Sequence, residues 1–263
     1  MDRIIGRLGL HGRDAELLHD RRGTTVYRIG GHAVKITAGL MAGREGEVLR
    51  LLDAEHYRAH GWEDDGRSWL RLRWIGGTTL WDALEPAHRG DDRPATRRRM
   101  LALAADAARA LADLHAAGWV HSDLQPDHVL YEGGVTHLID LACAQGPADV
   151  PSYPHRGGLA DTCAPEIAEA ILDSGGHVAT TAEADVWSLG ASLWWAWTRT
   201  TPVTYHGYPE DRTGRLRAIA ARRRAEVAAR PWPHRAFEEA VAACLAPDPA
   251  DRPAAADLAS IAE

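Results

Sequence analysis

The sequence predicts an α+β fold in two parts, a small, mainly β N-terminal part with one helix and a larger, mainly helical C-terminal part. Two observations predict it: short strand-like runs separated by glycines fill residues 1–75, and apolar residues recur at helical spacing over much of 76–263. A chain of 263 residues can bury a sizeable core without metal or disulfide cross-links. The pair Gly76 and Gly77 is the expected boundary between the two parts.

The N-terminal elements are predicted from local patterns. Residues 26–29 and 33–36 are strand-like runs separated by Gly30 and Gly31, which is typical of a hairpin with a two-glycine turn. Residues 44–54 carry apolar side chains on one helical face. Residues 67–75 alternate apolar and polar side chains, as a half-buried strand does.

The C-terminal part begins with a long helix predicted over 97–118, in which apolar residues recur at helical spacing and Gly118 provides a stop. Thr180 and Glu183 have the spacing of a capping box before residues 184–198. That segment is apolar on nearly every side, so we expect it in the core. Its tryptophans are interpreted as core residues: Trp187, Trp194, Trp195 and Trp197.

Composition excludes several classes of protein. A net charge of −7 argues against a nucleic-acid partner. No apolar run approaches the length of a membrane span, and the N-terminal segment is too charged for a secretory signal. We therefore expect no membrane association and a cytoplasmic location, while the oligomeric state stays open. Three widely spaced cysteines indicate free thiols.

The basic residues are distributed unusually. Lysine and arginine total 30, and Lys35 is the single lysine. Arginine replaces lysine readily where only a solvated charge is needed, whereas a site that needs a compact ammonium resists that replacement. Composition alone leaves open that this lysine survives by chance.

Two carboxylates have the spacing that phosphoryl transfer can use. Asp123 lies in the loop segment HSDLQPDHVL, and Asp140 ends the strand-like run THLID. One carboxylate of such a pair can orient a hydroxyl while the other holds Mg²⁺.

Six segments in the correct order resemble the protein kinase family across almost the whole chain. AVKI resembles the strand with the phosphate-binding lysine, HSDLQPDHVL resembles the catalytic loop, and DLA stands in the place of DFG. Ala164-Pro165-Glu166 is the APE motif unchanged, and ADVWSLG and Asp251-Arg252-Pro253 follow. The resemblance implies one kinase-like domain over 1–263, with an N-lobe at 1–75 and a C-lobe at 76–263.

The resemblance also implies roles for individual residues. Lys35 would contact the ATP phosphates and pair with Glu45, with Glu47 as the fallback partner. Asp123 would accept or orient the proton of the attacking hydroxyl, and Asp140 would coordinate Mg²⁺. The adenine would contact Val26, Ala33, Leu130 and the backbone of a hinge formed by Leu72, Arg73, Trp74 and Ile75. Glu166 and Arg252 resemble a buried structural ion pair, whose loss would mainly harm folding.

Departures from the family pattern lie around the phosphates. His128 replaces the second metal-binding Asn, so Mn²⁺ becomes an alternative to Mg²⁺, unless His128 only hydrogen-bonds the loop. Gln125 removes a positive charge near the γ-phosphate. Ser122 replaces the loop arginine, so we do not expect activation by loop phosphorylation. In the glycine-rich loop only Gly23 is present, one residue out of register.

Three functions follow as alternatives. The favoured one is an ATP-dependent kinase that phosphorylates a hydroxyl, Ser or Thr, of a protein or of a biosynthetic precursor peptide. The second is a small-molecule phosphotransferase of the antibiotic-kinase type, which generally lacks the APE and ADVWSLG segments. The third is a nucleotide-binding pseudokinase that serves as a partner scaffold.

Overall fold

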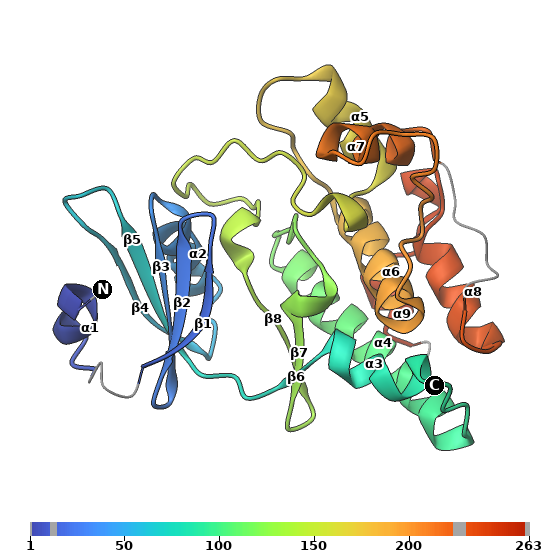
Figure 1. Cartoon of the computed structure of the whole chain (residues 1–263), viewed down its shortest axis with the longest axis horizontal. Coiled ribbons are helices and arrows are strands. Elements are labelled where there is room, and N and C mark those ends of the chain that lie inside the picture. The colour runs from blue at the N-terminus through green and yellow to red at the C-terminus, as the bar shows by residue number, and fades with distance from the viewer. Residues whose placement is uncertain (1, 11–14, 223–229, 261–263) are drawn as a thin grey trace. The chain divides into compact units, whose positions relative to one another are not determined.

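The computed structural model describes residues 2–10, 15–222 and 230–260. Contacts divide the chain into two compact units (Figure 1). The first comprises Met1–Gly76 with Ala148–Ser152, and the second comprises Gly77–Pro147 with Tyr153–Glu263. A mainly β unit and a mainly helical unit give the α+β, bilobal class that the sequence predicts.

The first unit is built on a five-stranded sheet in the order β1-β2-β3-β5-β4, in which the adjacent strands are antiparallel. Its strands are β1 (Ala15–Arg21), β2 (Thr24–Ile29), β3 (His32–Thr37), β4 (Tyr57–Trp62) and β5 (Ser68–Arg73), and its helices are α1 (Asp2–Arg7) and α2 (Met41–Leu51).

The predicted hairpin is confirmed. Ile29 pairs with His32 across Gly30 and Gly31, and Gly30 has φ 56°, which glycine adopts without steric cost. The helix predicted over 44–54 begins three residues earlier, at Met41. Helix α1 was not predicted; its Ile4 and Ile5 are buried against Ile29, Val34 and Ile36.

The second unit has a small sheet and seven α-helices among its described residues. The strands are β6 (Thr78–Thr79), β7 (Val129–Glu132) and β8 (Val135–Leu138). The helices are α3 (Leu80–His88), α4 (Pro94–Ala116), α5 (Pro165–Asp173), α6 (Ala182–Thr198), α7 (Arg212–Ala220), α8 (Arg235–Cys244) and α9 (Ala255–Leu258). Short 3₁₀ turns are η2 (Pro126–His128), η3 (Leu141–Cys143), η4 (Ala160–Thr162) and η6 (Pro249–Asp251).

Helix α6 forms the core of the second unit, as predicted. Trp197 is fully buried and contacts Trp194, Trp232 and Phe237 edge-on. Trp195 differs from the expectation, because it is only half-buried. Within the described ranges, no helix has the length and apolar character needed to cross a membrane.

The predicted cap of α6 is wrong by one residue. Thr181 is the N-cap, and its Oγ1 accepts a hydrogen bond from the Ala184 N–H at 3.2 Å. The Thr180 side chain instead contacts Ser122. Adjacent threonines both satisfy the local capping preference, so the spacing to Glu183 alone chose the wrong one.

Candidate active site

Lys35 and Glu45 form an ion pair inside the first unit. The Lys35 Nζ lies 2.7 Å from the Glu45 Oε2, and the side chains are 14% and 3% exposed. At this burial a carboxylate is costly unless a cation compensates it. Glu47, the fallback partner, instead pairs with Arg50 and His60. Glu45 is therefore the partner of the single lysine.

The short connection from β3 to α2 makes this pair feasible. The Thr37 Oγ1 accepts a hydrogen bond from the Ala42 N–H at 3.0 Å, which caps the first turn of α2 from the end of β3. Gly46 allows α2 to pack closely on β4, because a Cβ there would lie 2.2 Å from the His60 Cβ. The helix thus begins within a few residues of Lys35.

Strand register places the predicted adenine contacts of this unit on the same face of the sheet as Lys35. Val26 pairs directly with Lys35, and Ala33 pairs with Leu72. Ala33 and Lys35 are two residues apart in β3, so their side chains point to the same face. The opposite face carries Val34 and Ile36, which pack on α1.

The hinge segment has donors that are already engaged. The Arg73 N–H donates to the His56 carbonyl at 2.7 Å, and the Trp74 N–H donates to the Gly31 carbonyl at 2.8 Å. Ile75 is buried. An adenine edge would have to displace the Gly31 carbonyl or use other main-chain groups of this segment.

The turn between β1 and β2 replaces a glycine-rich loop. Arg21 pairs with Thr24, so only Arg22 and Gly23 form the turn, with φ of 52° and 76°. The Gly23 carbonyl accepts a hydrogen bond from the Ala38 N–H at 2.8 Å. The turn is tight, and it offers few main-chain N–H groups to a phosphate.

In the second unit, Asp185 of α6 anchors the loop segment that contains Asp123. Its Oδ2 accepts from the His121 N–H at 2.6 Å, and its Oδ1 accepts from the Ser122 N–H at 2.9 Å. The His115 Nε2 lies 3.1 Å from the same Oδ2. The Ser122 backbone has φ 68°, a conformation that the paired N–H contacts hold in place.

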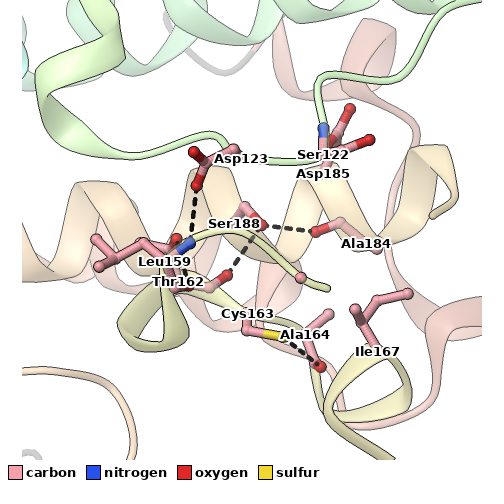
Figure 2. A pocket seen from close by; sticks show the side chains of 11 residues that line it. Ser122, Asp123, Leu159, Thr162, Cys163, Ala164, Ile167, Ala184, Asp185 and Ser188 are labelled. Carbon is pink, nitrogen blue, oxygen red and sulfur yellow. Dashed lines mark hydrogen bonds between the residues drawn. The ribbon is translucent and has the colours of Figure 1, made fainter. Parts of the chain in front are cut away.

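Asp123 is covered by the segment that precedes the APE motif. The Leu159 N–H donates to the Asp123 Oδ1 at 2.8 Å (Figure 2). Gly158 has φ 49°, and a Cβ there would lie 2.3 Å from the same oxygen. Burial raises the pKa of the Asp123 carboxyl above its ordinary value of 3.8. A pocket beside Asp123 is lined by Leu159, Thr162 and Ser188, among others.

His128 and Asp140 face each other at the end of the loop. The His128 Nδ1 lies 2.9 Å from the Asp123 carbonyl, which can only accept, so Nδ1 carries a hydrogen. The His128 Nε2 lies 3.7 Å from the Asp140 Oδ2. Asp140 has φ 59° and ψ 56°, and the Ile139 N–H donates to the His128 carbonyl at 3.0 Å.

The observed geometry of His128 is compatible with both interpretations of this residue, a loop hydrogen bond and a metal ligand. The ring does hydrogen-bond the loop, through Nδ1, and this same bond directs Nε2 toward Asp140. Metal-binding histidines commonly donate the second ring N–H to a carbonyl in this way. Leu130, the predicted adenine contact of this unit, is half-buried in β7 and pairs with Thr79.

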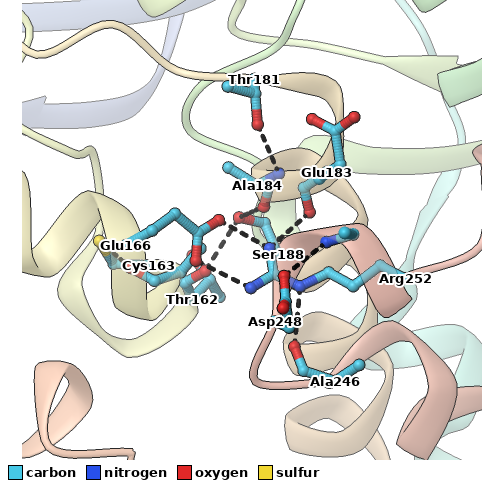
Figure 3. Close-up of polar contacts among 12 residues, drawn as sticks. Thr162, Cys163, Glu166, Thr181, Glu183, Ala184, Ser188, Ala246, Asp248 and Arg252 are labelled. Atoms are coloured by element: carbon cyan, nitrogen blue, oxygen red, sulfur yellow. Dashed lines mark hydrogen bonds and ion pairs between the residues drawn. The ribbon is translucent and has the colours of Figure 1, made fainter.

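Glu166 and Arg252 form the structural pair that the sequence predicts (Figure 3). Two guanidinium nitrogens lie 2.7 and 2.8 Å from the two carboxylate oxygens. Arg252 also donates to the carbonyls of Ala246 and Glu183, and its guanidinium carbon lies 5.1 Å from the Trp187 ring centre. The Arg252 side chain is fully buried.

A divalent ion fits the His128 and Asp140 donors only together with other ligands. Among residues 2–10, 15–222 and 230–260, no group of three or more His, Cys, Asp and Glu could hold a metal. One carboxylate and one imidazole nitrogen suffice where phosphates and waters complete the coordination, as is usual for Mg²⁺ at nucleotide sites.

Comparison with known proteins shows the family. A model of the protein kinase domain matches residues 43–261, so the chain belongs to the protein kinase family. Glu45, Asp123 and Asp140 lie inside the matched range and Lys35 lies outside it. Lys35 is connected to the matched range through its ion pair with Glu45.

Several relatives are serine/threonine-protein kinases. The chain is 33% identical over 146 residues to the serine/threonine-protein kinase-transforming protein mos of Moloney murine sarcoma virus, covering 51% of this chain and 36% of that protein. It is 32% identical over 173 residues to the proto-oncogene serine/threonine-protein kinase mos of Rattus norvegicus, covering 62% and 48%. It is 29% identical over 172 residues to serine/threonine-protein kinase 16 of Mus musculus, covering 58% and 54%. The matches thus span about half, or less, of these relatives.

Sequence reasoning missed the cover of Asp123. The Leu159 N–H contact is made by the backbone, so the residue type at 159 carries no signal for it. Gly157 and Gly158 were the available signal, since adjacent glycines with positive φ allow a close backbone approach.

Proposed function

We propose that this chain is an ATP-dependent protein kinase that transfers the γ-phosphate to a Ser or Thr hydroxyl of a protein or peptide. The buried Lys35–Glu45 pair carries the proposal, because the chain keeps its single lysine where a carboxylate holds the ammonium in one position. A precursor peptide in a biosynthetic pathway is the narrower form of this proposal. Because ATP is the donor, the activity would be cytoplasmic.

The reaction assigns a role to each residue. The acceptor hydroxyl attacks the γ-phosphorus, its proton passes to the Asp123 carboxylate, and the bond from phosphorus to the ADP oxygen breaks. The raised pKa of Asp123 makes it a stronger base than an ordinary aspartate. Lys35 would bind the α- and β-phosphates. Val26, Ala33, Leu72 and Leu130 would contact the adenine.

Asp140 and His128 would hold a divalent ion, which supplies charge neutralisation at the phosphates. Because Nδ1 donates to the Asp123 carbonyl, Nε2 is the ring nitrogen that would bind a metal, and an imidazole nitrogen favours transition-metal ions over Mg²⁺. We therefore propose that Mn²⁺ supports the activity better than Mg²⁺.

Phosphate transfer from labelled ATP to a Ser/Thr peptide library, with Mg²⁺ or Mn²⁺ in turn, tests the proposal. We expect Asp123→Asn to lower transfer by about 10²–10⁴-fold. Lys35→Arg should lower it as well, because a planar guanidinium does not reproduce the ammonium geometry. Glu45→Gln should lower transfer, whereas Glu47→Gln, two residues along the same helix, should leave it within about twofold. Full activity of Lys35→Arg would overturn the role of this lysine.

The metal preference has its own measurement. With Mn²⁺ and ATP bound, electron spin echo spectroscopy should detect a coordinated imidazole nitrogen in the wild-type protein and lose that signal in His128→Asn. The same variant should shift the preference toward Mg²⁺ by about tenfold. A nitrogen signal that survives in His128→Asn would contradict the assignment.

A second candidate function is a nucleotide-binding pseudokinase. The tight Arg22–Gly23 turn and the engaged N–H groups of Arg73 and Trp74 favour it, because both reduce the groups that can hold ATP. This alternative would be favoured if the protein binds ATP but shows no phosphate transfer that Asp123→Asn removes.

A further inference from the structure

Helix α1 packs on the strand that carries Lys35. Ile4 and Ile5 of α1 are 1% and 2% exposed, and they pack against Val34 and Ile36. These two strand residues flank Lys35 in β3, and their side chains point to the opposite face of the sheet. The proposed chemistry assigns no role to this helix. It covers the back of β3 at the position of the single lysine.

A first polar contact joins the end of α1 to β5. Arg71 of β5 pairs with Val34 of β3, and its Nη1 donates to the Leu8 carbonyl at 3.2 Å. Leu8 directly follows α1, and carbonyls at a helix end lack a partner within the helix. The Arg71 Nη2 also lies 2.7 Å from the His32 Nε2. Arg71 thus connects both β3 and the helix end to β5.

A second polar contact uses the carboxylate of Glu63. Trp69 of β5 pairs with Ile36 of β3, and its Nε1–H donates to the Glu63 Oε1 at 2.9 Å. The Arg7 guanidinium of α1 donates to the same carboxylate. The Glu63 side chain is 8% exposed, so its carboxylate is shielded from water where it joins Arg7 to Trp69.

The register of the strands places Lys35 between these two contacts. Three consecutive cross-strand pairs join β3 to β5 here: Val34 with Arg71, Lys35 with Leu70, and Ile36 with Trp69. Helix α1 contacts the first and the third pair, and the middle pair contains the lysine. When both neighbours of a strand residue are held, the direction of its Cα–Cβ bond is held as well. Glu45 holds the other end of the Lys35 side chain, on the opposite face.

We propose that α1 positions Lys35 for the nucleotide phosphates by clamping β3 to β5 behind this residue. Ile5 and Arg71 are then positioning residues, since they act on the phosphates only through Lys35. Without the helix, the apolar side chains behind the strand lose their packing and β3 can move, which displaces the ammonium. This inference rests on the proposed binding of ATP phosphates by Lys35.

The single lysine gives a direct probe of the clamp. Full-length protein labelled with ¹⁵N-lysine has one labelled main-chain amide, that of Lys35, which lies between β2 and β5. Hydrogen exchange of this amide should become at least about tenfold faster in Ile5→Ala, because a cavity behind β3 favours local opening. Ile5→Val, which removes one methyl group, should have a smaller effect in the same direction.

A buried isoleucine of the second unit gives the matched control. Ile219 of α7 is 1% exposed, so Ile219→Ala creates a comparable cavity away from β3. We expect this variant to leave the exchange of the Lys35 amide unchanged. Equal acceleration in Ile5→Ala and Ile219→Ala, or no acceleration in Ile5→Ala, overturns the inference.

Nucleotide binding is measured separately from phosphate transfer. In Ile5→Ala, the Kd for ATP with Mg²⁺, measured by calorimetry, should rise about tenfold because the ammonium is displaced. The KM for ATP should rise by a similar factor while kcat stays within about twofold, as expected when binding of the phosphates is weakened. Arg71→Met should act in the same direction, and Arg71→Lys, which can still donate to the Leu8 carbonyl, should restore part of the affinity.

The two proposals fail differently. If Ile5→Ala speeds the exchange of the Lys35 amide and weakens ATP binding but no peptide accepts phosphate, the kinase function fails and the positioning role stands. If peptides are phosphorylated with the same KM for ATP in Ile5→Ala and in the wild-type protein, the kinase function stands and the positioning role is wrong.

Discussion

Two regions of the helical unit hold buried charges in opposite ways. Around Arg252, every charge has a partner: the guanidinium meets the Glu166 carboxylate with two nitrogens and donates to two carbonyls. Around Asp123, the carboxylate accepts one neutral N–H from Leu159, and burial raises its pKa. The first region stabilises the fold, whereas the second keeps a carboxylate that binds a proton readily.

The Glu166–Arg252 ion pair should have the larger effect on stability. Arg252→Met should leave the Glu166 carboxylate without its cation and cost about 3–5 kcal/mol of the free energy of unfolding. Denaturation in urea measures it. Arg235→Met is the control, because its ion pair with Glu239 is exposed to solvent and should contribute little to stability.

A double variant separates the ion pair from packing. Glu166→Met with Arg252→Met should recover part of the lost stability, since no unpaired charge remains. A cost below about 1 kcal/mol for Arg252→Met would contradict the scaffold role.

Asp123→Asn should have the reverse effect of the scaffold variants. Activity should fall by about 10²–10⁴-fold, because the base is lost. Stability near neutral pH should rise, since the isosteric amide keeps an acceptor for the Leu159 N–H and removes a buried charge.

The stability difference between the wild-type protein and Asp123→Asn should depend on pH. Because the folded pKa of Asp123 is raised above 3.8, the native state binds its proton more tightly than the unfolded chain does. The ionised carboxylate therefore costs stability above that value, and the cost disappears as pH falls below it. Denaturation of both proteins between about pH 7 and about pH 4 should show the gap closing. A gap that is constant with pH would contradict the assignment to Asp123.

Gly158→Ala tests the close approach of the backbone to Asp123. The added Cβ would lie 2.3 Å from Oδ1, and the positive φ would be strained, so the carboxylate must move. A displacement of this size should lower kcat by roughly 10- to 100-fold with a smaller change in stability. Gly175→Ala is the control, because no atom lies within 4 Å of its added Cβ. Equal kcat values for Gly158→Ala and Gly175→Ala would contradict the proposal that Gly158 positions the Asp123 carboxylate.

Much of the fold was predictable because its signals are local. The Gly30-Gly31 turn fixes the β2–β3 hairpin, and the apolar segment 184–198 specifies a core helix wherever it packs. The start of α2 was missed because its N-cap, Leu40, has no capping side chain, and the acceptor for its first turn is Thr37 of the preceding strand. Helix α1 was missed because its two isoleucines form too short a pattern.

The sequence offered candidate side chains for the site but no information on its backbone contacts. Lys35, Glu45, Asp123 and Asp140 stay predictions, made from motif order and the family resemblance. The main-chain donors of Leu159, Arg73 and Trp74 depend on how segments far apart in sequence come together, which no residue pattern encodes. The tautomer of His128 depends in the same way on one carbonyl.

Dephosphorylation should have the smallest effect on activity, because uncharged hydrogen bonds surround Ser122, which stands in the place of the family's loop arginine. The Ser122 hydroxyl contacts the Thr180 hydroxyl, while Gln145 accepts from the Thr180 N–H and donates to the Val178 carbonyl, both at 3.2 Å. These contacts join the catalytic loop to the segment before α6 without a charge that a phosphate could satisfy. Activity should therefore change by less than about twofold after phosphatase treatment, checked by intact mass.

Adjacent threonines give the matched pair for this prediction. Thr180→Ala removes the contact to Ser122 and should lower kcat by severalfold, at a stability cost of about 1 kcal/mol. Thr181→Ala removes the cap of α6 and should cost a similar amount of stability while kcat stays nearly unchanged. A tenfold loss of activity on dephosphorylation, or equal kcat values for the two variants, would mean that the hydroxyl network does not set the position of the loop.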